Sequence, residues 1–287
     1  MRPRKNCSYK ALRTILIIRI LSQILETMKV AITGKGGVGK STLAGILAHL
    51  AKKSGKTVLA VDSDPDANLA FALGVSENER ANIIPIALQT ELIEERTQAK
   101  LKQFGQIFKL NPDISDVADR FSYDFNGIHL LVLGAIEAGG SGCACPENVF
   151  LRNLLSDIIL RHDEFVIVDM EAGIEHLGRG TARGVDLMIV VVEPTSQSVA
   201  TGRSVVKLAR QIGISEIRFV GNKISSESEQ KYLCDRLGVQ NLIGFIPYSE
   251  IIRQADRDGA PLIDRLSGEL LQAFETTYTN LTRVGNS

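Results

Sequence analysis

The sequence predicts a single three-layer α/β domain, in which a mostly parallel sheet of about seven strands is covered by helices on both faces. From Met28 onward, short apolar runs rich in Val and Ile alternate with longer helical stretches. The runs are nearly continuous in apolar character, which is typical of parallel strands buried on both faces. Alternation of strand and helix implies right-handed crossovers, which place helices on both sides of the sheet.

Each predicted strand is bounded by Gly, Asp or Pro. The strands are expected at Lys29–Thr33, Thr57–Asp62, Ile128–Leu133, Phe165–Asp169, Leu187–Val192, Arg218–Gly221 and Leu242–Pro247. The clearest helical stretches between them are Ser41–Ser54, Glu147–Arg161, Ser198–Ile212 and Ser226–Leu237. No repeat or low-complexity linker divides the chain, so one domain is expected over residues 28–287.

The longest departure from this alternation is residues 75–126, between the second and third predicted strands. It contains a charged helical stretch, Thr90–Gln103, followed by a loop. A connection of this length is either a functional segment such as a lid or a solvated surface insertion. The sequence leaves both interpretations open.

Residues 1–27 differ from the rest, with six basic residues against one acid. Their apolar stretch, Thr14–Leu25, is interrupted by Arg19 and is too short to span a bilayer. We expect a non-native or disordered extension, with Met28 as the start; the alternative is a basic amphipathic anchor.

The overall composition favours neither nucleic acid nor an anionic membrane as a partner. Lys and Arg number 33, as do Asp and Glu, so no net charge favours nucleic acid or an anionic membrane. Four cysteines in 287 residues do not make a disulfide framework, which indicates a reducing compartment. A cytoplasmic protein is expected.

A glycine-rich loop follows the first predicted strand. Its sequence, GKGGVGKST over residues 34–42, fits G-x-x-x-x-G-K-[ST] in the strand–loop–helix context that this phosphate-binding pattern requires. Glycines let backbone N–H groups converge on phosphate oxygens, and the helix N-terminus adds partial positive charge. Lys40 is expected to bridge the β- and γ-phosphates and Ser41 to ligate Mg²⁺. The expected nucleotide contacts are Gly34, Lys35, Gly36, Gly37, Val38, Gly39, Lys40, Ser41 and Thr42.

The additional lysine, Lys35, resembles the signature of the deviant Walker A loop of the ParA/MinD class of ATPases. Nitrogenase iron protein, partition ATPases and metallocluster maturation ATPases share this loop. The resemblance implies that Lys35 reaches across a dimer interface to the partner's nucleotide. The alternative is a solvated loop lysine.

Carboxylates follow two other predicted strands, at the edge where ligands bind in open α/β sheets. In DSDPDAN, Asp64 resembles the first-switch aspartate of the class, which orients the attacking water, and Asp62 would support Mg²⁺ through water. Asp169 ends a Walker B-like strand and would hold a Mg²⁺-bound water. The Gly173 N–H, in the second-switch position, would sense the γ-phosphate. The alternative for the Asp62–Asn68 segment is a simple turn.

The predicted base is adenine. Guanine selection normally needs a carboxylate where this chain has Ser225, whereas Asn222 offers a donor and an acceptor that match adenine N6 and N7. Lys223 is expected to contribute beside it. By resemblance, the backbone of Pro247 and Tyr248 flanks the adenine. ATP is therefore the expected nucleotide.

Cys143 and Cys145 follow the third predicted strand, in a glycine-rich stretch that leads into a helix at Pro146. Cys145 lies near the helix N-terminus, where a thiolate is favoured. Two thiolates fill half of a tetrahedral site, so a second copy of the pair from a symmetric dimer would complete it. Two free thiols or a redox-active C-x-C pair are the alternatives.

These motifs together resemble the CooC family of accessory ATPases for nickel insertion into the carbon monoxide dehydrogenase cluster. The segments that carry the resemblance are DSDPDAN, GAIEAGGSGCACPEN and DMEAGIEHLGRGT, in addition to the glycine-rich loop. The resemblance implies ATP-driven homodimerisation, a shared Ni²⁺ or Zn²⁺ site at Cys143 and Cys145, and apo carbon monoxide dehydrogenase as client. An iron–sulfur carrier, a partition or positioning ATPase, and a non-hydrolysing nucleotide-dependent scaffold are the alternatives.

Overall fold

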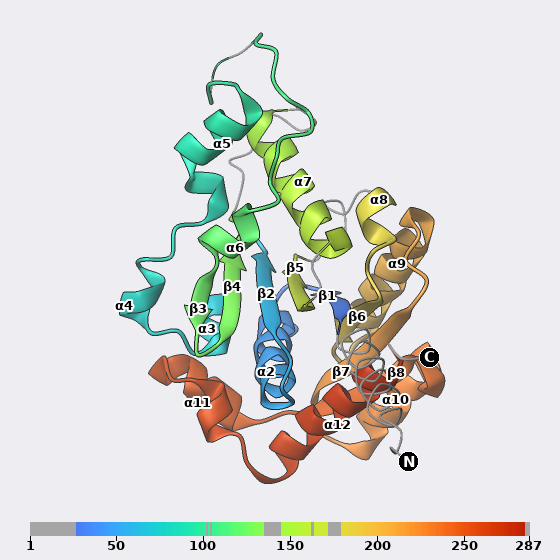
Figure 1. Cartoon of the computed structure of the whole chain (residues 1–287). Helices are drawn as coiled ribbons and strands as arrows, with labels where there is room; N and C mark the ends of the chain where they lie inside the picture. The colour runs from blue at the N-terminus through green and yellow to red at the C-terminus, as the bar shows by residue number, and fades with distance from the viewer. Residues whose placement is uncertain are drawn as a thin grey trace, which may run out of the picture.

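An eight-stranded sheet forms the centre of the molecule, in the order β3-β4-β2-β5-β1-β6-β7-β8 (Figure 1). The computed structural model describes residues 27–134 apart from 102 and 104, and residues 145–161, 164–171 and 179–284. Seven strands lie at the predicted positions: β1 (Met28–Gly34), β2 (Val58–Ser63), β4 (Ile128–Val132), β5 (Phe165–Met170), β6 (Leu187–Val192), β7 (Ile217–Ile224) and β8 (Leu242–Pro247). All pairings among these seven are parallel, so the predicted fold class is confirmed.

The predicted count of about seven strands omits one, because β3 (Tyr123–Phe125) pairs antiparallel with β4 at the sheet edge. A strand of three residues is too short to display an alternating pattern. The turn that joins the two strands does have a sequence signal. Asn126 and Gly127 both adopt positive φ, 52° and 76°, as a tight hairpin turn requires.

Helices cover both faces of the sheet, and alternate strand residues separate two cores. Val30 and Ile32 of β1 belong to one core and Ala31 to the other. Onto the first core pack α2 (Lys40–Lys53), α3 (Leu69–Leu73), α11 (Glu250–Asp258) and α12 (Gly268–Val284). Onto the second pack α5 (Thr90–Thr97), α6 (Val117–Phe121), α7 (Pro146–Arg161), α8 (Arg179–Ala182), α9 (Ser196–Ile212) and α10 (Glu227–Leu237). Short elements complete the described chain: α4 (Glu77–Arg80), η1 (Ile86–Leu88), η2 (Val239–Asn241) and η3 (Leu262–Arg265).

Part of the segment 75–126 is folded onto the second core, where Leu92, Ile93 and Val117 are buried. The helix α5 ends at Thr97 rather than at the predicted Gln103, because Gln98 adopts the left-handed conformation with φ 57°. α5 packs against α7, the helix that begins directly after Cys145. The segment is therefore a packed layer next to α7, the helix that follows Cys145, and not wholly a solvated insertion.

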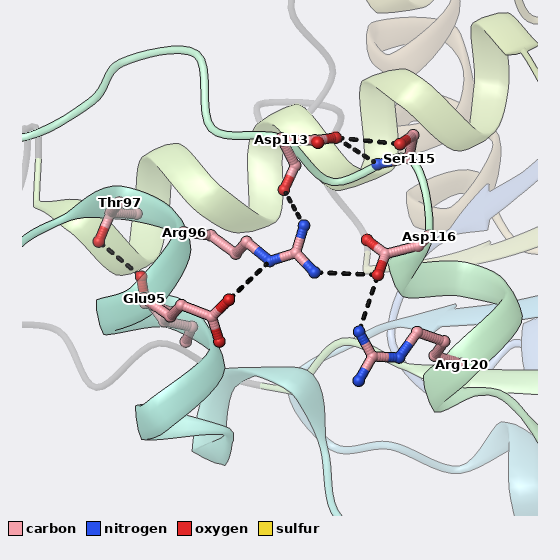
Figure 2. A network of polar contacts seen from close by, with 8 residues as sticks. Glu95, Arg96, Thr97, Asp113, Ser115, Asp116 and Arg120 are labelled. Atoms are coloured by element: carbon pink, nitrogen blue, oxygen red, sulfur yellow. Dashed lines mark hydrogen bonds and ion pairs between the residues drawn. The ribbon is translucent and has the colours of Figure 1, made fainter.

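A network of charged side chains joins α5 to α6 (Figure 2). Arg96 donates to the carbonyl oxygen of Asp113 at 3.1 Å and to Asp116 Oδ2 at 2.9 Å. The same Asp116 oxygen accepts from Arg120 at 2.8 Å. The two arginines hold the pKa of Asp116 down at about 2. This network fixes the chain on either side of the loop that separates the two helices.

Residues 1–26, which make up nearly all of the predicted extension, lie outside the described residues. Among the described helices, none combines the length and apolar character needed to cross a membrane.

Candidate nucleotide site

The glycine-rich loop lies between β1 and α2 at the carboxyl edge of the sheet. Gly34 has φ 153°, and a Cβ there would come within 2.5 Å of the carbonyl oxygen of Val191. Gly39, with φ 94°, caps α2, and a Cβ there would collide with the Asn222 side chain. Both positions therefore require glycine for the loop to curl tightly above the strand ends.

Lys40 and Ser41 begin α2, whose first turn contains no acidic residue. The helix N-terminus therefore presents uncompensated N–H groups and partial positive charge at the loop. Lys40 is 7% exposed, and its Nζ lies 3.6 Å from Asp64 Oδ2. A buried ammonium held at a helix N-terminus is suited to bind phosphate oxygens.

Three aspartates, Asp62, Asp64 and Asp169, lie beside the loop. The sheet register explains why Asp62 and Asp169 are neighbours. Asp62 of β2 and Asp169 of β5 are direct partners across the parallel ladder, and Asp169 also pairs with Ile32 of β1. Both are fully buried. Burial raises the pKa of Asp169 to about 7, and the neighbouring Asp62 acts in the same direction. Burial also raises the pKa of Asp62, to about 6.

The two carboxylates have different partners. Asp62 accepts the backbone N–H of Asp64 at 3.2 Å and that of Leu69 at 2.8 Å, so it anchors both ends of the first-switch loop. Among the described residues, neither oxygen of Asp169 has a partner with full hydrogen-bond geometry, although the nearby Ser41 hydroxyl and Lys40 ammonium lower the pKa of this carboxyl against the effect of burial. A buried carboxylate left in this way is costly unless a cation or a proton compensates it.

This donor set fits Mg²⁺. The Ser41 hydroxyl and the Asp62 and Asp169 carboxylates are hard oxygen donors, and the orphaned oxygens of Asp169 are available to a metal-bound water. Within the described ranges, no three His, Cys, Asp or Glu side chains form a ready-made metal site. That is expected for Mg²⁺, which takes few protein ligands and completes its shell with water and phosphate oxygens.

The predicted base-binding residues line the same cleft of about 800 Å³ as the loop. Asn222 donates through Nδ2 to the carbonyl oxygen of Val38 at 2.7 Å, while its Oδ1 is buried with no partner among the described residues. That free acceptor is what an adenine amino group requires. Pro247 and Tyr248 form another part of the cleft, and the Tyr248 N–H binds the carbonyl of Ile224 at 2.9 Å. Lys223 contacts the loop itself, donating to the carbonyl of Gly37 at 2.8 Å.

The signature lysine lies at the rim of the site. Lys35 Nζ donates to Gln197 Oε1 at 2.8 Å, in an exposed contact with the first turn of α9. An exposed contact of this kind is readily exchanged. Lys35 therefore lies at the exposed rim of the site and not inside the cleft.

The second-switch residue Gly173 lies outside the described residues. Glu171, two positions before it, is held by a hydrogen bond. The Thr33 hydroxyl, at the end of β1, donates to the carbonyl oxygen of Glu171 at 2.9 Å. Glu171 itself forms part of the nucleotide cleft.

Of the cysteine pair, Cys143 also lies outside the described residues. Cys145 is half-buried directly before α7, and its carbonyl accepts the N–H of Val149. The Asn148 side chain donates to Cys145 Sγ at 3.1 Å.

Four contacting residues were not predicted from the sequence: Thr33, Asn148, Glu193 and Gln197. Asn148 had a local signal, since an amide three residues after a cysteine that precedes a helix faces the sulfur. Thr33, Glu193 and Gln197 act on residues distant in sequence, so only the folded arrangement identifies them.

Comparison with known proteins agrees with this geometry. Residues 29–262 match the CobQ/CobB/MinD/ParA nucleotide binding domain family. The chain is 44% identical to the carbon monoxide dehydrogenase accessory protein CooC of Rhodospirillum rubrum, over 90% of this chain and 98% of that protein. It is 42% identical to an uncharacterized ATP-binding protein of Methanocaldococcus jannaschii, over 91% of this chain and all of that protein.

Solved structures show the same fold. The MinC:MinD cell division protein complex of Aquifex aeolicus contains a chain that matches with a TM-score of 0.64 and 22% identity, over 90% of this chain and 96% of that one. A ParA family ATPase of Chlorobium tepidum matches with a TM-score of 0.65 and 20% identity, over 89% and 99%. The chain therefore belongs to the CobQ/CobB/MinD/ParA nucleotide-binding family and, within it, to the CooC group.

Proposed function

We propose that this protein is a Mg²⁺-dependent ATPase that serves as a maturation factor for nickel insertion into the active-site cluster of carbon monoxide dehydrogenase. The observation that carries the ATPase part is the enclosed Lys40 head group beside Asp64, at the N-terminus of α2. The client is proposed from the relationship to CooC.

The proposed chemistry is phosphoryl transfer from ATP to water. Lys40 and the backbone N–H groups of the loop balance the charge on the phosphates, and Asp64 orients the attacking water. Bound Mg²⁺, held by Ser41 and by Asp62 and Asp169 through water, would supply further charge neutralisation at the β- and γ-phosphates. Asn222, Pro247 and Tyr248 would hold the adenine.

The base assignment is testable by phosphate release and by calorimetry with ATP and GTP. Asn222 Oδ1 can accept from the adenine amino group, and Ser225 supplies no carboxylate for guanine. We expect ATP to bind more tightly and to turn over in the presence of Mg²⁺. Equal or tighter binding of GTP would contradict the base assignment, and binding without turnover would indicate a nucleotide-dependent scaffold.

The metal part of the proposal depends on a homodimer in the cytoplasm. Each chain offers two thiolates, Cys143 and Cys145, and tetrahedral Ni²⁺ or Zn²⁺ takes four ligands. One metal would therefore be shared on the two-fold axis, and Lys35 would reach the partner's nucleotide across the same interface. Metal and nucleotide would then each promote the dimer, because coupling between binding events is reciprocal.

Sedimentation with metal analysis, with and without MgATP, tests this arrangement. We expect one metal per dimer, and we expect Cys143→Ala or Cys145→Ala to lose tight metal binding and metal-promoted dimerisation while retaining nucleotide. Cys234→Ala, which changes a half-buried thiol on α10, is the matched control. One metal per monomer, or cysteine variants that dimerise as the wild type does, would contradict the shared site.

A further inference from the structure

The end of β7 turns back onto the glycine-rich loop. Lys223 adopts the left-handed conformation with φ 58°. Its Nζ donates to the Gly37 carbonyl at 2.8 Å, and the preceding residue, Asn222, donates to the Val38 carbonyl at 2.7 Å. A left-handed non-glycine residue is strained, so the surrounding contacts must stabilise it.

Glu193 supplies one of those contacts. Its Oε1 lies 2.6 Å from Lys223 Nζ, so the ammonium is held between a carboxylate and the carbonyl of Gly37. Glu193 is fixed by its own surroundings, since its N–H donates to Ser198 Oγ at 2.9 Å and its carbonyl accepts from Thr195 N–H at 2.7 Å. The Glu193 side chain is 26% exposed and the Lys223 side chain 45%, so water screens the ion pair in part.

These contacts determine the direction of the loop's N–H groups. In a trans peptide the C=O and the following N–H point to opposite sides. Fixing the carbonyls of Gly37 and Val38 therefore fixes the N–H groups of Val38 and Gly39. The Val38 N–H makes only a long bond, 3.3 Å, to the carbonyl of Lys35. It can therefore be exchanged for a stronger acceptor such as a phosphate oxygen.

We propose that Glu193 is a positioning residue of the nucleotide site: it holds Lys223 against the Gly37 carbonyl and so keeps the loop in its phosphate-binding conformation. Glu193 does not line the nucleotide cleft, whereas Lys223 does, so Glu193 acts through Lys223. The ion pair with Glu193 keeps the Lys223 ammonium at the carbonyl oxygen of Gly37. This inference rests on the proposed nucleotide-binding function.

The test is calorimetric titration of the full chain with MgADP, together with steady-state ATP hydrolysis. Glu193→Gln should weaken MgADP binding about 3- to 10-fold, because a charge-assisted contact becomes a neutral one. KM for ATP should rise by a similar factor while kcat changes less than about twofold, since Glu193 does not touch the reacting atoms. The melting temperature of the nucleotide-free protein should stay near that of the wild type.

A double-mutant cycle separates this role from a general loss of packing. Lys223→Met should weaken MgADP binding at least as much as Glu193→Gln, and the double variant should be no weaker than Lys223→Met alone. Lys223→Met also tests the pair independently if Glu193→Gln folds poorly. The matched control is Glu216→Gln, which removes a carboxylate paired at 2.6 Å with Arg218 near the opposite end of β7. This control should bind MgADP as the wild type does.

The outcomes distinguish this inference from the proposed function. If the wild type itself does not bind MgADP, the proposed function fails. If the wild type binds and Glu193→Gln binds equally well, or if the two substitutions have additive effects, the positioning role of Glu193 is wrong and the proposed function stands.

Discussion

Asp169 in the nucleotide site and Asp116 in the segment 75–126 are the same residue type in opposite environments. Asp169 is fully buried, has no hydrogen-bond partner among the described residues, and has a pKa raised to about 7. Asp116 accepts from Arg96 and Arg120, and these contacts hold its pKa at about 2 (Figure 2). Asp169 has no direct ion pair and feels only the nearby charge of Lys40, whereas Asp116 contacts two arginines.

The difference separates a binding site from a scaffold. A fold gains nothing from burying an uncompensated carboxylate, so such a group indicates a ligand that supplies the missing charge. The charge of Asp116 is matched by Arg96 and Arg120 without a ligand, and the network joins α5 and α6 next to α7. The proposed division is therefore that the carboxyl edge of the sheet performs the chemistry while the segment 75–126 supports α7, the helix that follows Cys145.

The largest expected effect comes from Lys40, the buried cation nearest these acids. Lys40→Ala should lower the rate of ATP hydrolysis at least about 100-fold, because it removes a charge-assisted contact to the transferred phosphoryl group. Phosphate release under saturating MgATP measures the effect. Lys53→Ala is the matched control, since Lys53 lies at the other end of α2 in an exposed pair with Glu275. A Lys40→Ala variant with wild-type turnover would show that the loop is not a catalytic site.

Much of this site could be predicted from the sequence, because its signals are local. The glycine-rich loop, the seven longer strands and the carboxylates at strand ends each occupy a few consecutive residues. The strand β3 could not be found from its three residues, and the Asn-Gly pair at 126–127, which is typical of a hairpin turn, was not used to predict it. The contacts of Glu193 with Lys223 and of Gln197 with Lys35 join residues 30 or more positions apart, so they depend on the strand order.

A second prediction concerns the raised pKa of Asp169. In the unfolded chain Asp169 loses its proton near the usual pKa of 3.8. In the folded protein the same group retains its proton up to about pH 7. The free energy of unfolding of the metal-free protein should therefore decrease as pH rises from about 4 to about 7. Mg²⁺ competes with the same proton, so Mg²⁺ affinity should increase with pH, by up to about tenfold per unit below pH 7, and level off above it.

Titration of Mg²⁺ into the ADP-bound protein between pH 6 and 8 measures this dependence. Asp169→Asn should bind Mg²⁺ weakly and lose most of the pH dependence, since Asp62 alone remains to titrate near pH 6. Asp116→Asn should keep the wild-type profile, because Asp116 is ionised throughout this range. An Asp169→Asn variant with an unchanged profile would assign the proton to another group.

The smallest effect is expected at Asp116 itself, and its pH dependence has the opposite sign. Because the pKa of Asp116 is lowered from 3.8 to about 2, its contribution to stability is fully present above about pH 4 and is lost as pH falls toward 2. Asp116→Asn should therefore lower the denaturation midpoint slightly at pH 7, and the difference from the wild type should shrink below pH 4. The side chain is partly exposed and its partners are screened by solvent, so the effect stays small.

Asp119→Asn, on the exposed side of the same helix, is the control for a lost surface charge. If the Asp116→Asn difference were the same at pH 3 as at pH 7, or if it slowed ATP hydrolysis while Asp119→Asn did not, the proposed separation between the scaffold and the nucleotide site would be wrong.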